Sequence, residues 1–359
     1  MIKLLTVIGA RPQFVKAAAL SYALSKDDNI QETIIHTGQH FDESMSHVFF
    51  DELNIPEPKY NLGINSLSHG AMTGKMMIAL DEIFTQESPD VVLVYGDTNS
   101  TLAAGLTAQK LHIPVVHVEA GLRSFNMRMP EEVNRILTDR ISKILFCPTE
   151  NALNNLREEG YDKFGIRMEI TGDIMLDTSM LFSKLTESKT FPHLPDENFI
   201  LMTLHRAENT DDPVVLKEIV EAVNLLSEKY TVVLPLHPRT KIKIRETGLD
   251  LGCHVISPVG YMEMTYLIKN SDLVITDSGG LQKEAYFFEK YCITLRNETE
   301  WTELVDNGYN YLVYSDFGTE LINKVEELYG KTIENSIPLY GTGDAAGKII
   351  GVLKEEFGR

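Results

Sequence analysis

The chain has few of the residues and segments that mark several classes of protein. Only three of its 359 residues are cysteines, and they lie far apart, so we expect reduced core thiols rather than a disulfide framework or a metal site. No apolar run approaches the ~20 residues of a membrane span. Positive charge is also scarce, because 33 Lys and Arg face 52 Asp and Glu, a formal net charge of −19. This balance disfavours nucleic acids and anionic membranes as partners.

What the chain does contain is ordinary for a globular protein, with 43% apolar and 24% charged residues. Its length predicts two domains, each large enough to bury its own core, with a single α/β barrel as the alternative on length alone. The first residues run directly into an apolar strand over residues 2–8, with no signal-peptide pattern, so we expect a cytoplasmic protein.

Short apolar strands alternate with helical patterns along the chain. In the first half, apolar strands near residues 2–8, 91–95 and 112–118 are each followed by a helical segment. The alternation restarts near Phe199 after Thr171-Gly172-Asp173. Such spacing is typical of βαβ units on parallel sheets, so the fold class predicted is α/β with two Rossmann-like, doubly wound domains. We place the boundary between them at residues 170 and 171.

The stretch from Leu273 to Ala285 predicts an anion site. The β-branched run over residues 273–276 reads as a buried strand, and Ser278, Gly279 and Gly280 lie where a helix begins. Unpaired N–H groups and the positive end of the helix dipole would face a phosphate there, and Glu284 could reach a ribose hydroxyl. An ordinary strand, turn and helix with a flexible Gly-Gly pair is the alternative.

A second corner of the same kind follows the first strand. Pro12 is well placed as the first residue of a helix after Gly9-Ala10, and Arg11 and Lys16 put positive charge near its beginning. A diphosphate substrate would use that charge. A solvated first turn is the structural alternative.

Acids and histidines follow several other strands of the two sheets. Asp97, Glu119, His205 and His237 each come at a strand end, and Glu131 opens a helix after Pro130. Ligands of doubly wound sheets bind beyond the carboxyl ends of the strands, so converging acids there indicate acid/base chemistry beside a bound anion. His237 could instead anchor a loop, and Glu131 could serve the helix dipole.

Six motifs in order resemble the non-hydrolysing UDP-N-acetylglucosamine 2-epimerase family over nearly the whole chain. They are Gly9-Ala10-Arg11-Pro12, Gly96-Asp97-Thr98, the run from His117 to Arg123, the run from Pro130 to Arg135, the run from His205 to Asn209, and the run from Thr276 to Gly280. Six motifs in order are a strong signal, although each alone would be weak.

The resemblance implies a GT-B fold, with the nucleotide sugar in an interdomain cleft, and a homodimer. Its domains would be residues 1–170 and a UDP-binding domain of residues 171–343. A C-terminal helix over about 344–359 would pack back on the first domain. The implied activity converts UDP-GlcNAc to UDP-ManNAc by eliminating UDP across C1 and C2 and adding it back, with no cofactor.

The resemblance also assigns roles to residues. Asp97, Glu119 and Glu131 match the family's catalytic acids, because inversion at C2 needs proton transfer on both faces of the sugar. His205, with Arg11, would stabilise the departing diphosphate. The positions that would bind the nucleotide diphosphate and ribose are Lys16, His237, Ser278, Gly279, Gly280 and Glu284.

Three stretches depart from the family pattern. The usual His-Arg-Arg-Glu is replaced by His205-Arg206-Ala207-Glu208, and the usual Thr-Glu-Arg-Pro-Glu by the run Thr299 to Glu303. Phe41-Asp42 follows His40 where activator-binding members have Arg and Gln, which argues against allosteric activation by substrate. These departures resemble the branch acting on UDP-2,3-diacetamido-2,3-dideoxyglucuronate, so both substrates stay open. A GT-B glycosyltransferase, a hydrolysing epimerase and a UDP-sugar sensor are the alternatives from other classes.

Overall fold

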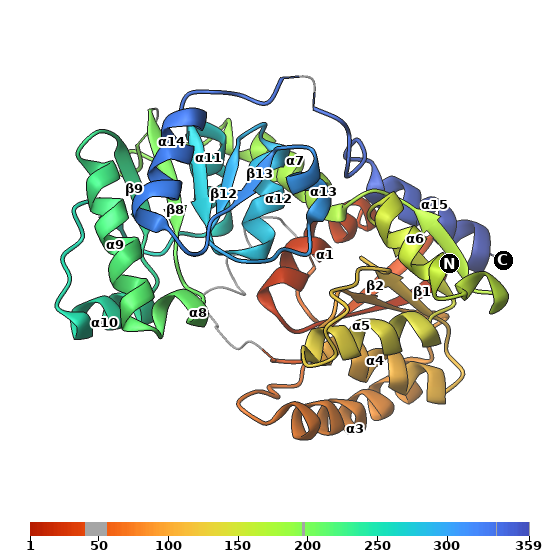
Figure 1. Ribbon diagram of the computed structural model, residues 1–359. Coiled ribbons are helices and arrows are strands. Elements are labelled where there is room, and N and C mark those ends of the chain that lie inside the picture. The colour runs from red at the N-terminus through yellow and green to blue at the C-terminus, as the bar shows by residue number, and fades with distance from the viewer. Residues whose placement is uncertain (40–55, 196–197, 335, 359) are drawn as a thin grey trace. The chain divides into compact units, whose positions relative to one another are not determined.

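The computed structural model describes residues 1–39, 56–195, 198–334 and 336–358. The chain divides into two compact units, one formed by Met1–Met180 with Pro338–Arg359 and the other by Leu181–Ile337. Each unit contains one parallel β-sheet with helices packed on it (Figure 1).

The sheet of the first unit has the strand order β3-β2-β1-β4-β5-β6-β7, and every neighbouring pair is parallel. Its strands are β1 (Ile2–Ile8), β2 (Ile30–His36), β3 (Tyr60–Asn61), β4 (Val91–Tyr95), β5 (Val115–Val118), β6 (Ile144–Cys147) and β7 (Arg167–Ile170). β1 lies between β2 and β4, so the direction of winding reverses there. This order is the doubly wound one that the strand and helix alternation predicts.

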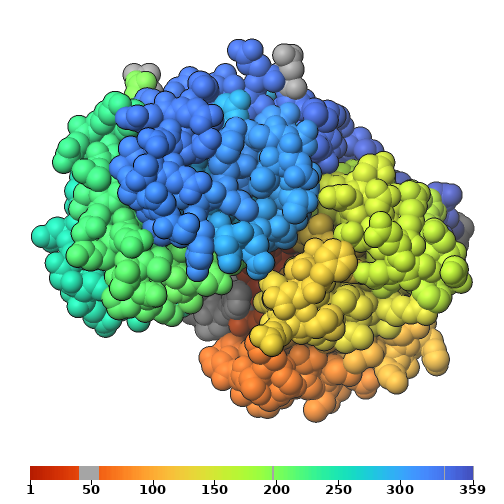
Figure 2. Space-filling view, in the orientation of Figure 1, coloured from red at the N-terminus to blue at the C-terminus, as the bar shows by residue number. Residues whose placement is uncertain are grey.

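Helices cover both faces of this sheet. They are α1 (Arg11–Leu24), α3 (His69–Glu87), α4 (Asn99–Lys110), α5 (Pro130–Ile141), α6 (Glu150–Glu158), the short η1 (Tyr161–Lys163), the first part of α7 (Ile174–Thr186), and α15 (Ala345–Phe357). α3 buries one apolar stripe at helical spacing, including Met72, Met76 and Leu80, in a core shared with β1 and β4. In the space-filling view the orange surface of α3 and the yellow surface of α5 form the outer layer on this side (Figure 2).

The end of the chain returns to the first unit. The side chain of Asp177 accepts hydrogen bonds from the backbone N–H groups of Ala345 and Ala346 at the start of α15. Near the other end of that helix, Glu355 pairs with Arg167 at 2.8 Å. α15 also packs against α1. These contacts attach the C-terminal helix to the sheet of the first unit.

The two units divide within α7, between Met180 and Leu181, rather than at residues 170 and 171. The hydroxyl of Thr178 donates to the carbonyl of Val15 in the first unit. Four residues later, the ring of Phe182 packs edge-on against Tyr261 of the second unit, with centroids 4.6 Å apart. The helix continues through the division because no turn residue interrupts it. The sequence therefore has no local signal for the boundary at this position.

The sheet of the second unit has the order β10-β9-β8-β11-β12-β13, again parallel throughout. Its strands are β8 (Phe199–Thr203), β9 (Thr231–Pro235), β10 (His254–Ile256), β11 (Leu273–Thr276), β12 (Cys292–Thr294) and β13 (Asn310–Leu312). Its helices are α8 (Ala207–Thr210), α9 (Pro213–Ser227), α10 (Pro238–Thr247), α11 (Tyr261–Asn270), α12 (Gly279–Phe287), α13 (Thr302–Asp306), η2 (Phe317–Leu321) and α14 (Ile322–Leu328). The order repeats that of the first unit, with β8 in the position of β1.

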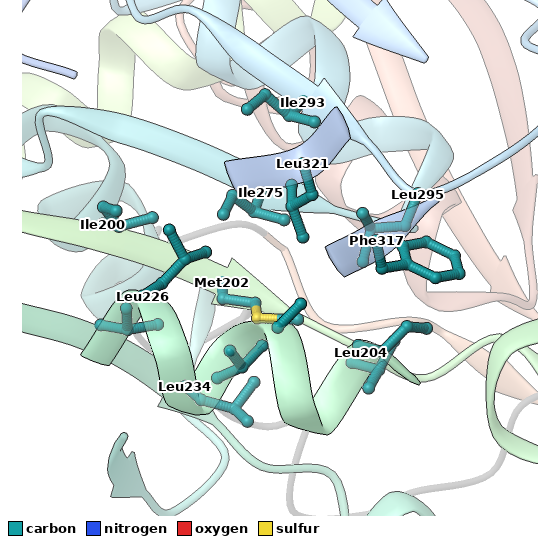
Figure 3. Packing of buried hydrophobic residues seen from close by; sticks show 14 of the residues in the cluster. Ile200, Met202, Leu204, Leu226, Leu234, Ile275, Ile293, Leu295, Phe317 and Leu321 are labelled. Atoms are coloured by element: carbon teal, nitrogen blue, oxygen red, sulfur yellow. The ribbon is translucent and has the colours of Figure 1, made fainter. Parts of the chain in front are cut away.

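Side chains alternate across this second sheet, as the strand geometry requires. Ile200 and Met202 of β8, with Leu204 just beyond it, pack with Leu226 of α9 and Phe317 of η2 (Figure 3). The intervening residues of β8 face α11 and α12 on the other side. Both faces of β8 are therefore buried, which explains its uninterrupted apolar sequence. The predicted α/β class with two Rossmann-like sheets is confirmed.

Candidate functional site

Each sheet has one point where the winding reverses, and the residues at both points are those singled out from the sequence. In the first unit, the loops after β1 and β4 carry Gly9 and Asp97. In the second unit, the loops after β8 and β11 carry His205 and Ser278. Ligands of doubly wound sheets bind beyond the strand ends at such a point. Each unit therefore has a candidate binding edge.

At the edge of the first unit, Lys16 and Glu119 form a buried ion pair. Lys16 comes from α1, and Glu119 follows β5 with a backbone φ of +68°. Gly96, with a φ of +60°, lies against the pair: a Cβ built there would be 3.2 Å from Glu119 Oε2 and 3.3 Å from Lys16 Nζ. Glycine is needed at this position both for its backbone conformation and for the close approach.

Asp97, the residue after that glycine, is held by α5. Its Oδ2 lies 2.7 Å from Arg135 Nη2, and its backbone carbonyl accepts a hydrogen bond of 2.8 Å from Asn134 Nδ2. Arg135 also pairs with Glu132 through Nη1, at 2.5 Å, so its planar fork holds two carboxylates at once. The side chain of Asp97 remains 27% exposed, so a ligand can still reach it.

Two other predicted residues lie at helix beginnings with exposed side chains. Glu131 is in the first turn of α5, immediately before Glu132. Arg11 is the first residue of α1, and Lys16 lies farther along the same helix. The structure therefore brings Lys16, Glu119 and the Gly96-Asp97 turn together, and it places Glu131 on the helix that holds Asp97.

At the edge of the second unit, a buried aspartate organises the turn after β8. Asp277 Oδ1 lies 3.0 Å from Nδ1 of His205, and Oδ2 accepts backbone N–H groups of His205 and Arg206, both at 2.8 Å. Burial raises the pKa of a carboxyl group, but these hydrogen bonds outweigh it and hold the pKa of Asp277 below its usual value. His205 is 45% exposed, so its oriented ring can meet a ligand.

The predicted anion cradle is the beginning of α12. Ser278 is the N-cap residue, and Gly279 and Gly280 are the first two helical residues. A Cβ at Gly280 would have no atom within 4 Å, so the space beside it is open. Gly279 is more enclosed, because its carbonyl accepts a 2.9 Å bond from the Trp301 indole and a Cβ there would be 2.7 Å from Glu300 Oε1.

The two remaining predicted binding residues have defined local positions. Glu284 lies farther along α12 with its side chain buried. His237 is the N-cap of α10, and its Nδ1 accepts a hydrogen bond from the backbone N–H of Arg239 at 3.3 Å. That contact matches the loop-anchor alternative for His237. A binding role for either residue stays a prediction.

Several residues of these edges were not singled out from the sequence. Asp277 had a local signal, since it follows a buried strand directly and precedes the glycine turn. Arg135 had a weaker one, a basic residue one helical turn after two acids. The buried contacts of His117 and Asp139 had none, because an apolar strand and a polar helix far apart in sequence supply the two side chains.

Three further expectations concern features that the sequence argues against. His40, Phe41 and Asp42, on which the expectation about allosteric activation depends, lie outside the described residues. Within the described ranges, no group of three or more His, Cys, Asp and Glu side chains is arranged to hold a metal ion. Those ranges also contain no helix that combines the length and apolar character of a membrane span.

Comparisons with known proteins relate both edges to one family. A family model for UDP-N-acetylglucosamine 2-epimerase matches residues 22–354. A Pseudomonas aeruginosa protein named UDP-2,3-diacetamido-2,3-dideoxy-D-glucuronate 2-epimerase is 52% identical over 352 residues, 98% of this chain and 99% of that protein.

Solved structures give the same result. The Methanocaldococcus jannaschii UDP-GlcNAc 2-epimerase in complex with UDP-GlcNAc and UDP is 42% identical, with a TM-score of 0.88 over 99% of this chain and 100% of that one. The Neisseria meningitidis enzyme bound to UDP-GlcNAc is 32% identical, with a TM-score of 0.88 over the same shares. The fold is therefore the GT-B-like one of these isomerases, and the chain belongs to the UDP-N-acetylglucosamine 2-epimerase family.

Proposed function

We propose that the protein inverts C2 of a UDP-linked 2-acetamido sugar by eliminating UDP and adding it back. The observation that carries the proposal is the cluster at the winding reversal of the first sheet, where Asp97 and Glu119 lie on adjacent turns around Gly96. Two carboxylates beside one glycine are suited to proton transfer and have no evident use in a protein that only binds a nucleotide sugar.

The chemistry explains why acids are needed. Carbon 2 of such a sugar lacks an adjacent carbonyl group, so its proton is not acidic. In the proposed elimination, a carboxylate removes this proton, the C2–H electron pair forms the C1–C2 double bond, and the C1–O bond breaks to release UDP. In the return step UDP attacks C1 of the resulting 2-acetamidoglucal, and a carboxylic acid delivers a proton to the other face of C2. Asp97, Glu119 and Glu131 are the candidates for these transfers.

The second unit would hold the leaving group. Its N–H groups at Ser278, Gly279 and Gly280 belong to a helix beginning, where the backbone favours a negatively charged ligand. Negative charge develops on the diphosphate as the C1–O bond breaks, and His205, oriented by Asp277, would stabilise it. The remaining candidates for nucleotide contacts are Arg11, Lys16, Glu284 and His237.

For the sugar, we propose UDP-2,3-diacetamido-2,3-dideoxyglucuronate as the first candidate. The Pseudomonas aeruginosa relative named for that substrate is 52% identical over nearly the full length of both chains. The departures at Ala207 and Trp301 from the usual family pattern point in the same direction. UDP-GlcNAc is the second candidate, because the solved complexes that the chain resembles contain it.

The test uses purified protein and nucleotide sugar alone in heavy water. We expect deuterium at C2 of both epimers, detected by NMR and mass spectrometry, and no accumulation of free UDP in proportion to turnover. Transfer to an acceptor without C2 exchange would select a glycosyltransferase, and stoichiometric UDP would select a hydrolysing epimerase. The ratio of kcat/KM for the two candidate sugars then identifies the substrate.

A Glu119→Gln variant separates catalysis from binding. The amide keeps the shape of the side chain but cannot accept the C2 proton as a base. We expect its affinity for UDP to stay close to that of the wild type while deuterium exchange is lost. Full exchange in this variant would remove Glu119 from the proposed mechanism. The homodimer stays a prediction, and we also propose a place for the protein in cell-surface polysaccharide biosynthesis.

A further inference from the structure

A buried polar network in the first unit connects the two turns that carry Asp97 and Glu119. At its centre is Asp139 of α5, which is fully buried. Its Oδ1 lies 2.7 Å from Nδ1 of His117 on β5, and its Oδ2 accepts from Nη1 of Arg123 at 2.7 Å and from the backbone N–H of Gly121 at 3.2 Å. The other ring nitrogen of His117, Nε2, lies 2.7 Å from the carbonyl oxygen of Gly96.

The partners of His117 determine where its protons are. The carbonyl of Gly96 can only accept, so Nε2 carries a hydrogen. Oδ2 of Asp139 accepts hydrogen bonds from Arg123 and Gly121, and Oδ1 faces Nδ1 of His117. A carboxylate oxygen accepts, so Nδ1 of His117 would be the donor in this contact. Burial opposes ionisation, but the contacts with His117 and Arg123 lower the pKa of Asp139. His117 therefore has an oxygen acceptor beside each ring nitrogen, an arrangement that suits a ring donating on both sides.

The charged groups of this network are paired within it. Arg123 contacts Asp139 at 2.7 Å and Glu159 at 2.6 Å, and His117 contacts Asp139 at 2.7 Å. Buried ionic groups are stable only when they are paired and hydrogen-bonded in this way. Removal of one carboxylate charge from the centre would leave a buried cation without compensation.

The network fixes backbone at the positions where it matters for the acids. Gly96 precedes Asp97 directly, and Gly121 is two residues after Glu119. Glu119 itself has a φ of +68°, a left-handed conformation that costs a residue with a Cβ about 1–3 kcal/mol and persists only where neighbouring contacts impose it. Asp139 contacts the chain on both sides of this strained residue, at His117 and at Gly121, and through His117 it reaches Gly96.

We propose that Asp139, acting through His117, is a positioning residue for proton transfer at C2, because it sets the relative placement of Asp97 and Glu119 without touching the substrate. α5 then contributes twice to the same task. Arg135 and Asn134 hold Asp97 directly, and Asp139 holds Gly121 directly and Gly96 through His117. This inference rests on the proposed C2 epimerisation.

The experiment begins with an Asp139→Asn variant, which keeps the shape of the side chain and removes its charge. We expect kcat for C2 deuterium incorporation to fall about 10- to 100-fold, since small misplacement of catalytic groups has effects of that order. KM should change by less than about twofold, because the proposed diphosphate contacts at Ser278, Gly279 and Gly280 are not part of this network. A fall in kcat without a matching change in KM is a split that a purely structural role does not require.

A second variant and a control make the result decisive. His117→Gln cannot span the distance between Asp139 and Gly96 with both hydrogen bonds, so it should lose as much activity as Asp139→Asn. The double variant should lose no more than the worse single one, because the two residues act as a unit. Glu159→Gln removes a carboxylate charge from the same network without a contact to Gly96 or Gly121, and it should retain activity within about twofold of the wild type.

The outcomes separate this inference from the proposed function. Wild-type protein that exchanges no deuterium overturns the proposed function and this inference with it. Wild-type exchange with an unimpaired, folded Asp139→Asn variant overturns the inference alone, as does an equal loss in the Glu159→Gln control. If Asp139→Asn does not fold, His117→Gln gives the answer, and unimpaired exchange in it has the same meaning.

Discussion

Arg135 offers the most direct link between a contact in the structure and activity. Its guanidinium group bridges Asp97 at 2.7 Å and Glu132 at 2.5 Å, and its side chain is nearly buried. An Arg135→Met variant keeps the length and apolar character of the stem but removes both pairs. We therefore expect two separate effects, one on the stability of the first unit and one on the rate of proton transfer.

The size of each effect follows from the surroundings. Removal of one partner from a buried ion pair costs about 3–5 kcal/mol. Glu132 keeps hydrogen bonds from Ser124 and Phe125, and Asp97 is partly exposed, so we expect the low end, about 3 kcal/mol, or roughly 6–12 °C in Tm. For activity, a carboxylate displaced by about 1 Å loses about 100-fold in kcat, equivalent to about 2.7 kcal/mol of barrier.

The assay combines thermal unfolding with C2 deuterium exchange below the transition temperature of the variant. Arg135→Lys should be intermediate, because an ammonium group keeps the charge but cannot bridge two carboxylates with a planar fork. Arg140→Met is the matched control on the same helix: its exposed guanidinium lies over the ring of Phe164, a contact worth about 1 kcal/mol or less. A destabilised Arg135→Met variant with wild-type exchange would refute the idea that this contact positions Asp97.

Two other outcomes follow from the structure. A Gly279→Val substitution should raise the Kd for UDP about tenfold or more, equivalent to about 1.4 kcal/mol, in calorimetric titrations. The fold should tolerate the substitution, because the nearest atom to the new side chain is the flexible end of Glu300. Unchanged affinity for UDP would count against the predicted anion cradle. Burial raises the pKa of Glu32, so the stability that this group adds is complete below about pH 4.5 and is lost as pH rises towards its folded-state pKa. The side chain of a Glu32→Gln variant does not titrate. In urea titrations across that pH window, the free energy of unfolding of the variant should therefore rise relative to that of the wild type by up to about 1.4 kcal/mol per pH unit. A difference that stays constant with pH would contradict this.

Local patterns were sufficient for the elements of the fold. The apolar run over residues 273–276 became β11, and Ser278 became the N-cap of α12, because burial on both faces and turn chemistry act within a few residues. One boundary was wrong for a local reason: the strand expected from residue 112 begins at Val115, since His112 has a φ of +60° and Pro114 has no N–H to donate. Such errors arise where a residue's own backbone conformation overrides the apolar pattern.

The sequence by itself determined the α/β class, the repeated strand and helix alternation, the strand ends that carry polar residues, and the family. Only the tertiary structure decided which of those residues meet. Lys16 and Glu119 are paired although 103 positions separate them. Asp139 on α5 reaches Gly96, which follows β4, through His117 on β5. Periodicity records which face of an element is buried, whereas an ion pair or hydrogen bond between distant segments depends on sheet order and helix packing, which no short stretch of sequence contains.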